Sequence, residues 1–159
     1  MSRMIGHHAQ AVRIARWAPT HGASTSVRTL AARIINAQQD EIATMQHWLR
    51  DRLQPAPDPG GSDHTMHAGH DIQMPGMLTA AQLAQLDAAR GAEFDKLFLS
   101  LMIQHHRGAV AMVKDLFGSY GAAQDETVFK FASDVNVDQS TEIERMERML
   151  SALTHRTQP

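Results

Sequence analysis

The stretch that decides the fold of this chain is MIQHHRGAV at residues 102–110, because a near copy, MIGHHAQAV, already stands at residues 4–12. Each copy is followed by a second shared phrase, QxxEIxxM, at residues 38–45 and again at residues 139–146. Two phrases that recur in the same order indicate an internal duplication. The repeated letters include His, Glu and Met, which bind metals, as well as the apolar residues that packing alone requires.

Composition restricts the class of protein. The chain has 159 residues, 43% hydrophobic and 20% charged, which is enough for one compact domain with a core. A formal charge of -2 with interspersed signs argues against a nucleic-acid partner, because proteins that bind the phosphate backbone usually carry a basic face. The sequence contains neither an apolar run of about eighteen residues nor a signal peptide, so no membrane span is predicted in it. The absence of Cys is compatible with an oxidising compartment.

The two copies begin differently. A helical stretch from Glu93 leads into Met102, whereas only three residues precede Met4. By the offset between the copies, the counterpart of Glu93 would lie before Met1. We therefore expect the first helix to be truncated at its amino end, and an export signal is a further candidate for the missing part.

Helical periodicity predicts an all-α protein, since no stretch alternates with the period of a strand. A short helix is expected over residues 79–90, where Thr79 and Gln82 have the spacing of a capping box. Each long helix carries an apolar face that needs a partner, which predicts a four-helix bundle made of two helical hairpins. The long helices are expected at residues 2–17, 25–53, 92–117 and 125–153.

We expect a single domain over residues 1–159. Repeat one spans residues 1–53 and repeat two spans residues 79–159. Between them, residues 54–78 are rich in Pro, Gly, His and Met without periodicity, which is typical of a long crossover at the surface.

The repeated His and Glu residues are predicted to meet in the core. Glu41 and Glu142 interrupt apolar helix faces, and a buried carboxylate without a partner is costly. Two explanations stay open: His and Glu hydrogen-bond each other in a structural polar layer, or the His side chains coordinate a metal. Successive helical residues differ by about 100°. One His of each pair should therefore point inward while the other flanks it.

Methionine narrows the choice of metal. Met4 and His8 are four residues apart, as are Met102 and His106, so each pair shares a helix face. Thioether sulfur favours Cu(I), whereas imidazole alone also serves Cu(II), Zn and Fe, which remain alternatives. The helical metal candidates are Met4, His7, His8, Met102, His105, His106 and Met112. Met45, Met146 and Met149 are more typical of core packing.

The crossover is a second candidate for metal binding. It is too polar and too broken to form a core, and short His-rich tracts are typical of metal sites. Its metal candidates are His64, Met66, His67, His70, Met74 and Met77. A solvated linker is the alternative. The isolated His21, His47 and His155 are expected at the surface.

Motifs of catalysis are missing from the sequence. It contains no Glu-x-x-His, no His-Glu-x-x-His, no Gly-rich phosphate loop and no serine elbow. Catalysis is therefore not indicated, and a metal-dependent redox enzyme is the least favoured of the three function classes considered.

The doubled phrases, together with MPGMLT at residues 74–79, resemble the family called domain of unknown function 305, over essentially the whole chain. The resemblance implies a ferritin-like bundle in a largely bacterial, often exported family that includes periplasmic copper-binding proteins. The motif positions that it carries over are Met4, His7, His8, Gln38, Glu41, Met45, Met102, His105, His106, Gln139, Glu142 and Met146. Repeat one departs at Ile14 and Trp48, where repeat two has Met112 and Met149. Two sites of equal strength are therefore not expected.

The sequence thus predicts a copper-binding protein, with Cu(I) favoured, for buffering, tolerance or delivery of copper in the periplasm or outside the cell. The residues around the ligands, which would hold and orient the imidazoles, are Gln38, Glu41, Met45, Gln139, Glu142 and Met146. A metal ion is the expected partner, with a second copy of the chain or a copper-transfer protein as further candidates. Because a ligating His must be neutral, copper binding should weaken as the pH falls through the range in which imidazole is protonated. A non-catalytic structural or interaction bundle is the alternative function.

Overall fold

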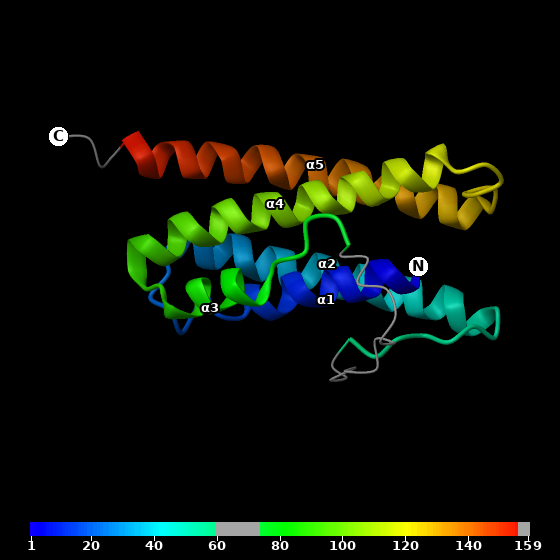
Figure 1. Cartoon of the computed structure of the whole chain (residues 1–159), viewed down its shortest axis with the longest axis horizontal. Coiled ribbons are helices and arrows are strands. Elements are labelled where there is room, and N and C mark those ends of the chain that lie inside the picture. The colour runs from blue at the N-terminus through cyan, green and yellow to red at the C-terminus, as the bar shows by residue number, and fades with distance from the viewer. Residues whose placement is uncertain (60–73, 156–159) are drawn as a thin grey trace. The chain divides into compact units, whose positions relative to one another are not determined.

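The computed structural model describes residues 1–59 and 74–155, and every regular element in these residues is an α-helix. Contacts divide the chain into two compact units, Met1–Met74 and Pro75–Pro159. In the first unit α1 and α2 pack side by side, and in the second α4 packs along α5 with the short α3 beside it (Figure 1). The helices are α1 (Ser2–Ala15), α2 (Thr25–Asp51), α3 (Ala80–Ala88), α4 (Gly91–Gly118) and α5 (Glu126–His155). The prediction of an all-α chain built from two helical hairpins and a short extra helix is confirmed.

The first hairpin, α1 with α2, follows from apolar faces at helical spacing. Ile5 and Ile14 of α1 and Ile34 of α2 are fully buried. The α2 helix begins after Ser24, whose hydroxyl accepts a hydrogen bond from the backbone N–H of Val27 at 3.4 Å. Such a side-chain acceptor satisfies one of the backbone donors that a helix start leaves unpaired.

The second hairpin, α4 with α5, is built in the same way. Phe94 and Phe98 of α4 are fully buried and stack with ring centroids 5.6 Å apart. At the start of α5, the Asp125 carboxylate accepts a hydrogen bond from the backbone N–H of Val128 at 3.1 Å. The capping box predicted for Thr79 and Gln82 is present at the start of α3.

The isolated histidines do not all lie at the surface. His47 is exposed, as predicted, and lies 3.0 Å from the Asp51 carboxylate. The prediction for His21 was wrong: this side chain is buried, stacks on Trp17 with ring centroids 5.7 Å apart, and lies 3.0 Å from the Thr20 hydroxyl. The turn after α1 folds back over Trp17, a local tertiary contact that helical periodicity does not report.

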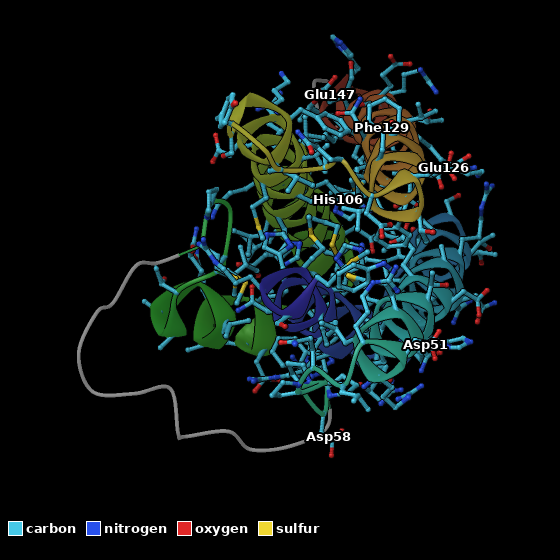
Figure 2. The ribbon with its side chains drawn as sticks, turned by 90° about the vertical axis from the view of Figure 1, so that its right-hand side faces the viewer. Asp51, Asp58, His106, Glu126, Phe129 and Glu147 are labelled. Atoms are coloured by element: carbon cyan, nitrogen blue, oxygen red, sulfur yellow. The ribbon has the colours of Figure 1, made fainter. Side chains whose placement is uncertain are left out.

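Within the second unit, charged side chains and histidine segregate. Glu126 and Glu147 lie on the outer side of α5, whereas His106 lies among packed side chains of α4 (Figure 2). None of the helices in the described residues is both long and apolar enough to cross a membrane.

Candidate metal centre

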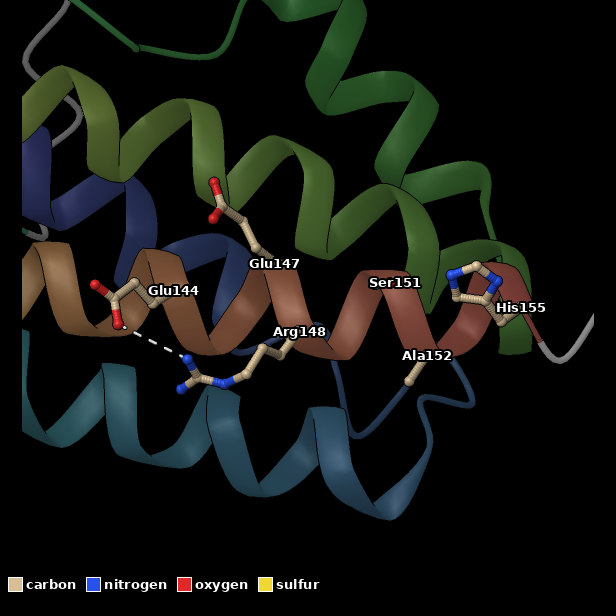
Figure 3. A pocket seen from close by; sticks show the side chains of 6 residues that line it. All are labelled: Glu144, Glu147, Arg148, Ser151, Ala152 and His155. Atoms are coloured by element: carbon tan, nitrogen blue, oxygen red, sulfur yellow. Dashed lines mark ion pairs between the residues drawn. The ribbon is translucent and has the colours of Figure 1, made fainter.

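Two hollows in the described surface are lined by neither the repeated His residues nor the repeated Glu residues. One lies along α5 and is crossed by an ion pair in which Arg148 and Glu144 are 3.7 Å apart (Figure 3). Its lining residues are Glu144, Glu147, Arg148, Ser151, Ala152 and His155. A second lies along α4 and α5 beside Arg107 and Lys114. The repeated His and Glu residues are instead in the helix-packing layer of each hairpin.

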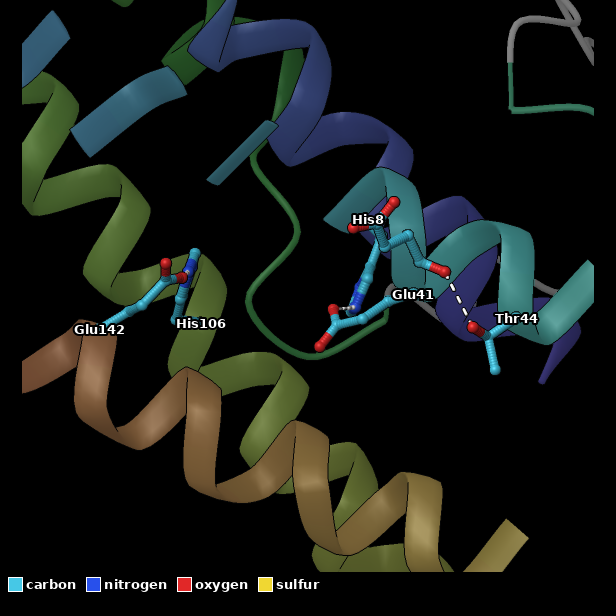
Figure 4. Close-up of polar contacts among 6 residues, drawn as sticks. His8, Glu41, Thr44, His106 and Glu142 are labelled. Carbon is cyan, nitrogen blue, oxygen red and sulfur yellow. Dashed lines mark hydrogen bonds and ion pairs between the residues drawn. The ribbon is translucent and has the colours of Figure 1, made fainter. Parts of the chain in front are cut away.

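In the first hairpin the predicted partners meet. His8 of α1 is fully buried, and its Nε2 lies 2.6 Å from a carboxylate oxygen of Glu41 on α2 (Figure 4). The Glu41 side chain keeps 14% of its exposure, so the carboxylate is partly hydrated. The helical register that makes Glu41 interrupt an apolar face therefore places it opposite His8.

The second hairpin repeats this contact. His106 of α4 is fully buried, and its Nε2 lies 2.7 Å from a carboxylate oxygen of Glu142 on α5 (Figure 4). The Glu142 side chain keeps 18% of its exposure. We call these two contacts the His–Glu pairs. Their near identity shows that the duplication is structural as well as sequential.

The His–Glu pairs determine which imidazole nitrogen is available. A carboxylate can only accept, so a neutral imidazole must place its proton on Nε2 and its lone pair on Nδ1. The Nδ1 atoms of His8 and His106 are buried, and neither has a hydrogen-bond partner among the described residues. A histidine that donates one N–H to a carboxylate and presents its other nitrogen is the usual arrangement of a metal-ligating histidine.

The second histidine of each copy is also in the core. His7 and His105 are fully buried, so both members of each His-His doublet are enclosed. The ring centroids are 6.4 Å apart for His7 and His8, and 6.3 Å apart for His105 and His106. The 100° step separates the directions of the two rings without exposing either of them.

Gln38 and Gln139 differ from the glutamates. Both are buried, yet both side-chain polar atoms of Gln38 and the Oε1 of Gln139 have no hydrogen-bond partner among the described residues. The predicted orienting role requires a hydrogen bond to an imidazole. The glutamates make this hydrogen bond, and these amide atoms do not make it within the described residues.

The methionines fall into two groups. Met45, Met102 and Met146 are fully buried, whereas Met4, Met112, Met74 and Met77 are half-buried. The methyl carbon of Met74 lies beside α1, 3.9 Å from the position that a Cβ on Gly6 would occupy. The predicted candidates His64, Met66, His67 and His70 lie outside the described residues.

Two residues that the sequence analysis did not single out hold the segment that contains Met74 and Met77. Gly76 and Gly108 allow the backbone of this segment to lie directly against the backbone of α4. Gly108 could have been noticed, because a glycine inside a helix costs about 1 kcal/mol relative to alanine and so needs a packing reason. Within residues 1–59 and 74–155, no three His, Asp or Glu side chains are grouped as metal ligands.

A family model described as domain of unknown function (DUF305) matches residues 1–150, and the chain belongs to this family. No curated protein sequence matches the chain.

Solved structures of the family share the fold. A DUF305 protein from Streptomyces coelicolor, whose name proposes secretion, is 28% identical with a TM-score of 0.78, over 95% of this chain and 89% of that one. A DUF305 fragment from Deinococcus radiodurans is 30% identical with a TM-score of 0.78, over 95% and 92%. CopM in its Cu(II)-bound form is 29% identical with a TM-score of 0.71, over 94% and 91%. The chain therefore has the helical-bundle fold of these proteins.

Proposed function

We propose that this member of the DUF305 family binds copper as its cargo, prefers Cu(I), and serves in copper buffering, tolerance or delivery outside the cytoplasm. The observation that carries the proposal is the His–Glu pair, present once in each hairpin at 2.6 and 2.7 Å. Each pair leaves a buried Nδ1 lone pair without a hydrogen-bond partner among the described residues. Such a nitrogen favours a metal ion because leaving it desolvated and unpaired is costly.

The donor set fits a soft ion. A site made of His and carboxylates alone would need several of these side chains together, and the described residues contain no such group of three. Thioethers are available to complete the ligand set, because Met4 and Met102 precede the paired histidines by one helical turn. His8 and His106 with these methionines would hold the ion, and Glu41 and Glu142 would orient the imidazoles. Imidazole with thioether selects copper, and Cu(I) above Cu(II).

The structural relatives support the same class of cargo. CopM has been solved in Cu(I)-bound, Cu(II)-bound and silver-bound forms, and these chains are 26%, 29% and 26% identical to this one. Silver(I) is a soft monovalent cation like Cu(I), so the proposed preference for thioether ligands agrees with them. The secretion proposed by the name of the Streptomyces coelicolor relative supports a place outside the cytoplasm. Delivery would add a copper-transfer protein or a second copy of the chain as partner.

A structural bundle is the second candidate function, and one observation favours it. The Nε2–carboxylate contact by itself satisfies one polar atom of each side chain. The same two contacts would stabilise helix register if no metal ever bound. A redox enzyme has no comparable support.

Replacing His105 and His106 with Leu in the full chain separates the two functions. Cu(I) would be titrated anaerobically against a chromophoric chelator, with circular dichroism recording the fold. We expect copper binding at the second hairpin to be lost while helix content stays. His47→Leu, at an exposed histidine outside the packed layer, is the matched control and should bind as the parent does. If the parent protein is folded but binds no Cu(I), the proposal that copper is its cargo is wrong, and the structural function remains.

The same titration at mildly acidic pH tests the ligand atoms. Protonation removes the Nδ1 lone pair, so Cu(I) affinity should fall as imidazole becomes charged. An affinity that is equal at neutral and mildly acidic pH would exclude imidazole ligation.

A further inference from the structure

At the end of the crossover, the backbone of Pro75 and Gly76 packs directly against the backbone of α4 at Gly108. We call this contact the backbone seat. Gly108 is buried in the middle of α4, and a Cβ placed on it would lie 2.0 Å from the carbonyl oxygen of Pro75 and 2.6 Å from the Cα of Gly76. Contacts below 3 Å do not occur for real Cβ atoms, and here the opposing atoms are backbone that cannot rotate away. Only glycine at position 108 permits this approach.

The other side of the seat has the same requirement. Gly76 has φ of +76°, a conformation that favours glycine. A Cβ on Gly76 would also lie 2.6 Å from the carbonyl oxygen of Gln104 and 2.7 Å from the Cα of Gly108. At both glycines, opposing backbone atoms leave no space for a Cβ. This close backbone packing therefore requires glycine on both sides.

Side chains anchor the sequence that follows. The side-chain N–H of Gln82, in the first turn of α3, donates to the side-chain oxygen of Gln104 on α4 at 2.9 Å. Leu78, next to the seat, is buried. Residues 75–82 are therefore attached to the side of α4 that carries Gln104 and Gly108.

In the sequence, the residues of the backbone seat stand between two candidate thioether ligands. Met74 and Met77 flank Pro75 and Gly76, and both are half-buried. With the backbone of Pro75 and Gly76 held on α4, the side chain of Met77 starts from a fixed point. An unanchored segment of the same composition would have to be ordered each time an ion bound, at a cost in conformational entropy for each residue.

We propose that Gly108 is a positioning residue for Cu(I): its bare backbone seats Pro75 and Gly76 on α4, so that Met77 is preorganised as a thioether ligand. The inference rests on the proposed copper function and extends it by assigning a task to the MPGM segment (residues 74–77). It also explains why repeat two has Gly108 where repeat one has Gln10.

The test is Gly108→Ala in the full chain. The added Cβ must displace the segment, so Cu(I) affinity should fall about 10-fold or more, the loss typical of residues that orient ligands. Gly118→Ala is the matched control, because Gly118 lies on the same helix and has nothing within 4 Å of its Cβ position. It should bind as the parent does. In the metal-free protein, the methyl NMR signal of Met77 should shift in Gly108→Ala and not in Gly118→Ala.

A double-mutant cycle separates positioning from general damage to the fold. In a chain that already carries Met77→Leu, Gly108→Ala should cost little further affinity. An equal loss in both backgrounds, or a Gly108→Ala protein that binds like the parent, would overturn the inference while copper binding stands. A parent protein that binds no Cu(I) would instead overturn the proposed function, and with it this inference.

Discussion

The two hairpins share one polar contact and differ around it. Each pairs the Nε2 of a fully buried histidine with a partly exposed glutamate, His8 with Glu41 and His106 with Glu142. Farther along the helix that carries the paired histidine, the first hairpin has Ile14 fully buried where the second has Met112 half-buried. The comparison teaches that duplication kept the groups that must satisfy each other, whereas neighbouring positions were free to change.

The differences favour the second hairpin as the richer source of thioethers. Its α4 carries Met102 and Met112, and α4 also seats the segment that contains Met77. In the first hairpin, Trp48 takes the place of Met149. A soft cation gains most where thioethers are most numerous. We therefore expect copper to bind more strongly at the second hairpin.

The largest effect should come from the methionines that both hairpins bury equally. Met45→Ala and Met146→Ala each remove a fully buried side chain, and each should lower the free energy of unfolding by about 2–5 kcal/mol. Urea denaturation of the metal-free proteins measures both. Met149→Ala, at a half-buried position of α5, is the control and should cost less. A loss below about 1 kcal/mol at Met45 or Met146 would show that the site can collapse around the cavity.

An intermediate effect is expected from the glutamates. Glu41→Gln and Glu142→Gln keep an oxygen that accepts from Nε2 but remove the charge, so each should weaken Cu(I) at its own hairpin by about 10- to 100-fold. The free energy of unfolding should change by about 1 kcal/mol, because the hydrogen bond remains in neutral form. Competition titration and urea denaturation distinguish the two. Unchanged copper affinity with lowered stability would favour the structural function.

The smallest effect concerns an ion pair on the second hairpin. Arg107 lies 2.7 Å from Glu147, with side chains 65% and 45% exposed, and repeat one has Ala9 in place of Arg107. Arg107→Ala should cost no more than about 1 kcal/mol of unfolding free energy, and less at high salt. Urea denaturation at two salt concentrations measures it. A loss above about 2 kcal/mol at high salt would mean that the Arg107 stem contributes through packing.

Much of the fold was predictable because its causes are local. The apolar spacing of α2, the Ser24 cap and the Thr79–Gln82 capping box are properties of short windows, and the helix ends fell within about two residues of the prediction. The burial of His21 was not predictable, since it depends on stacking across the turn onto Trp17. Of the candidate site, the meeting of histidine with glutamate followed from charge on an apolar face. The orienting role of Gln38 and Gln139 stays a prediction.

The sequence by itself determined the duplication, the helical class, and the residue types that face one another in each hairpin, since periodicity and the cost of an unpaired carboxylate leave few arrangements. Tertiary structure alone decided which imidazole nitrogen contacts the carboxylate and where the MPGM segment attaches. Both depend on distances of a few ångströms between residues far apart in the chain, as in the Nε2 contact of His106 with Glu142 at 2.7 Å. Such distances arise only when helices pack, because no local preference of the backbone specifies them.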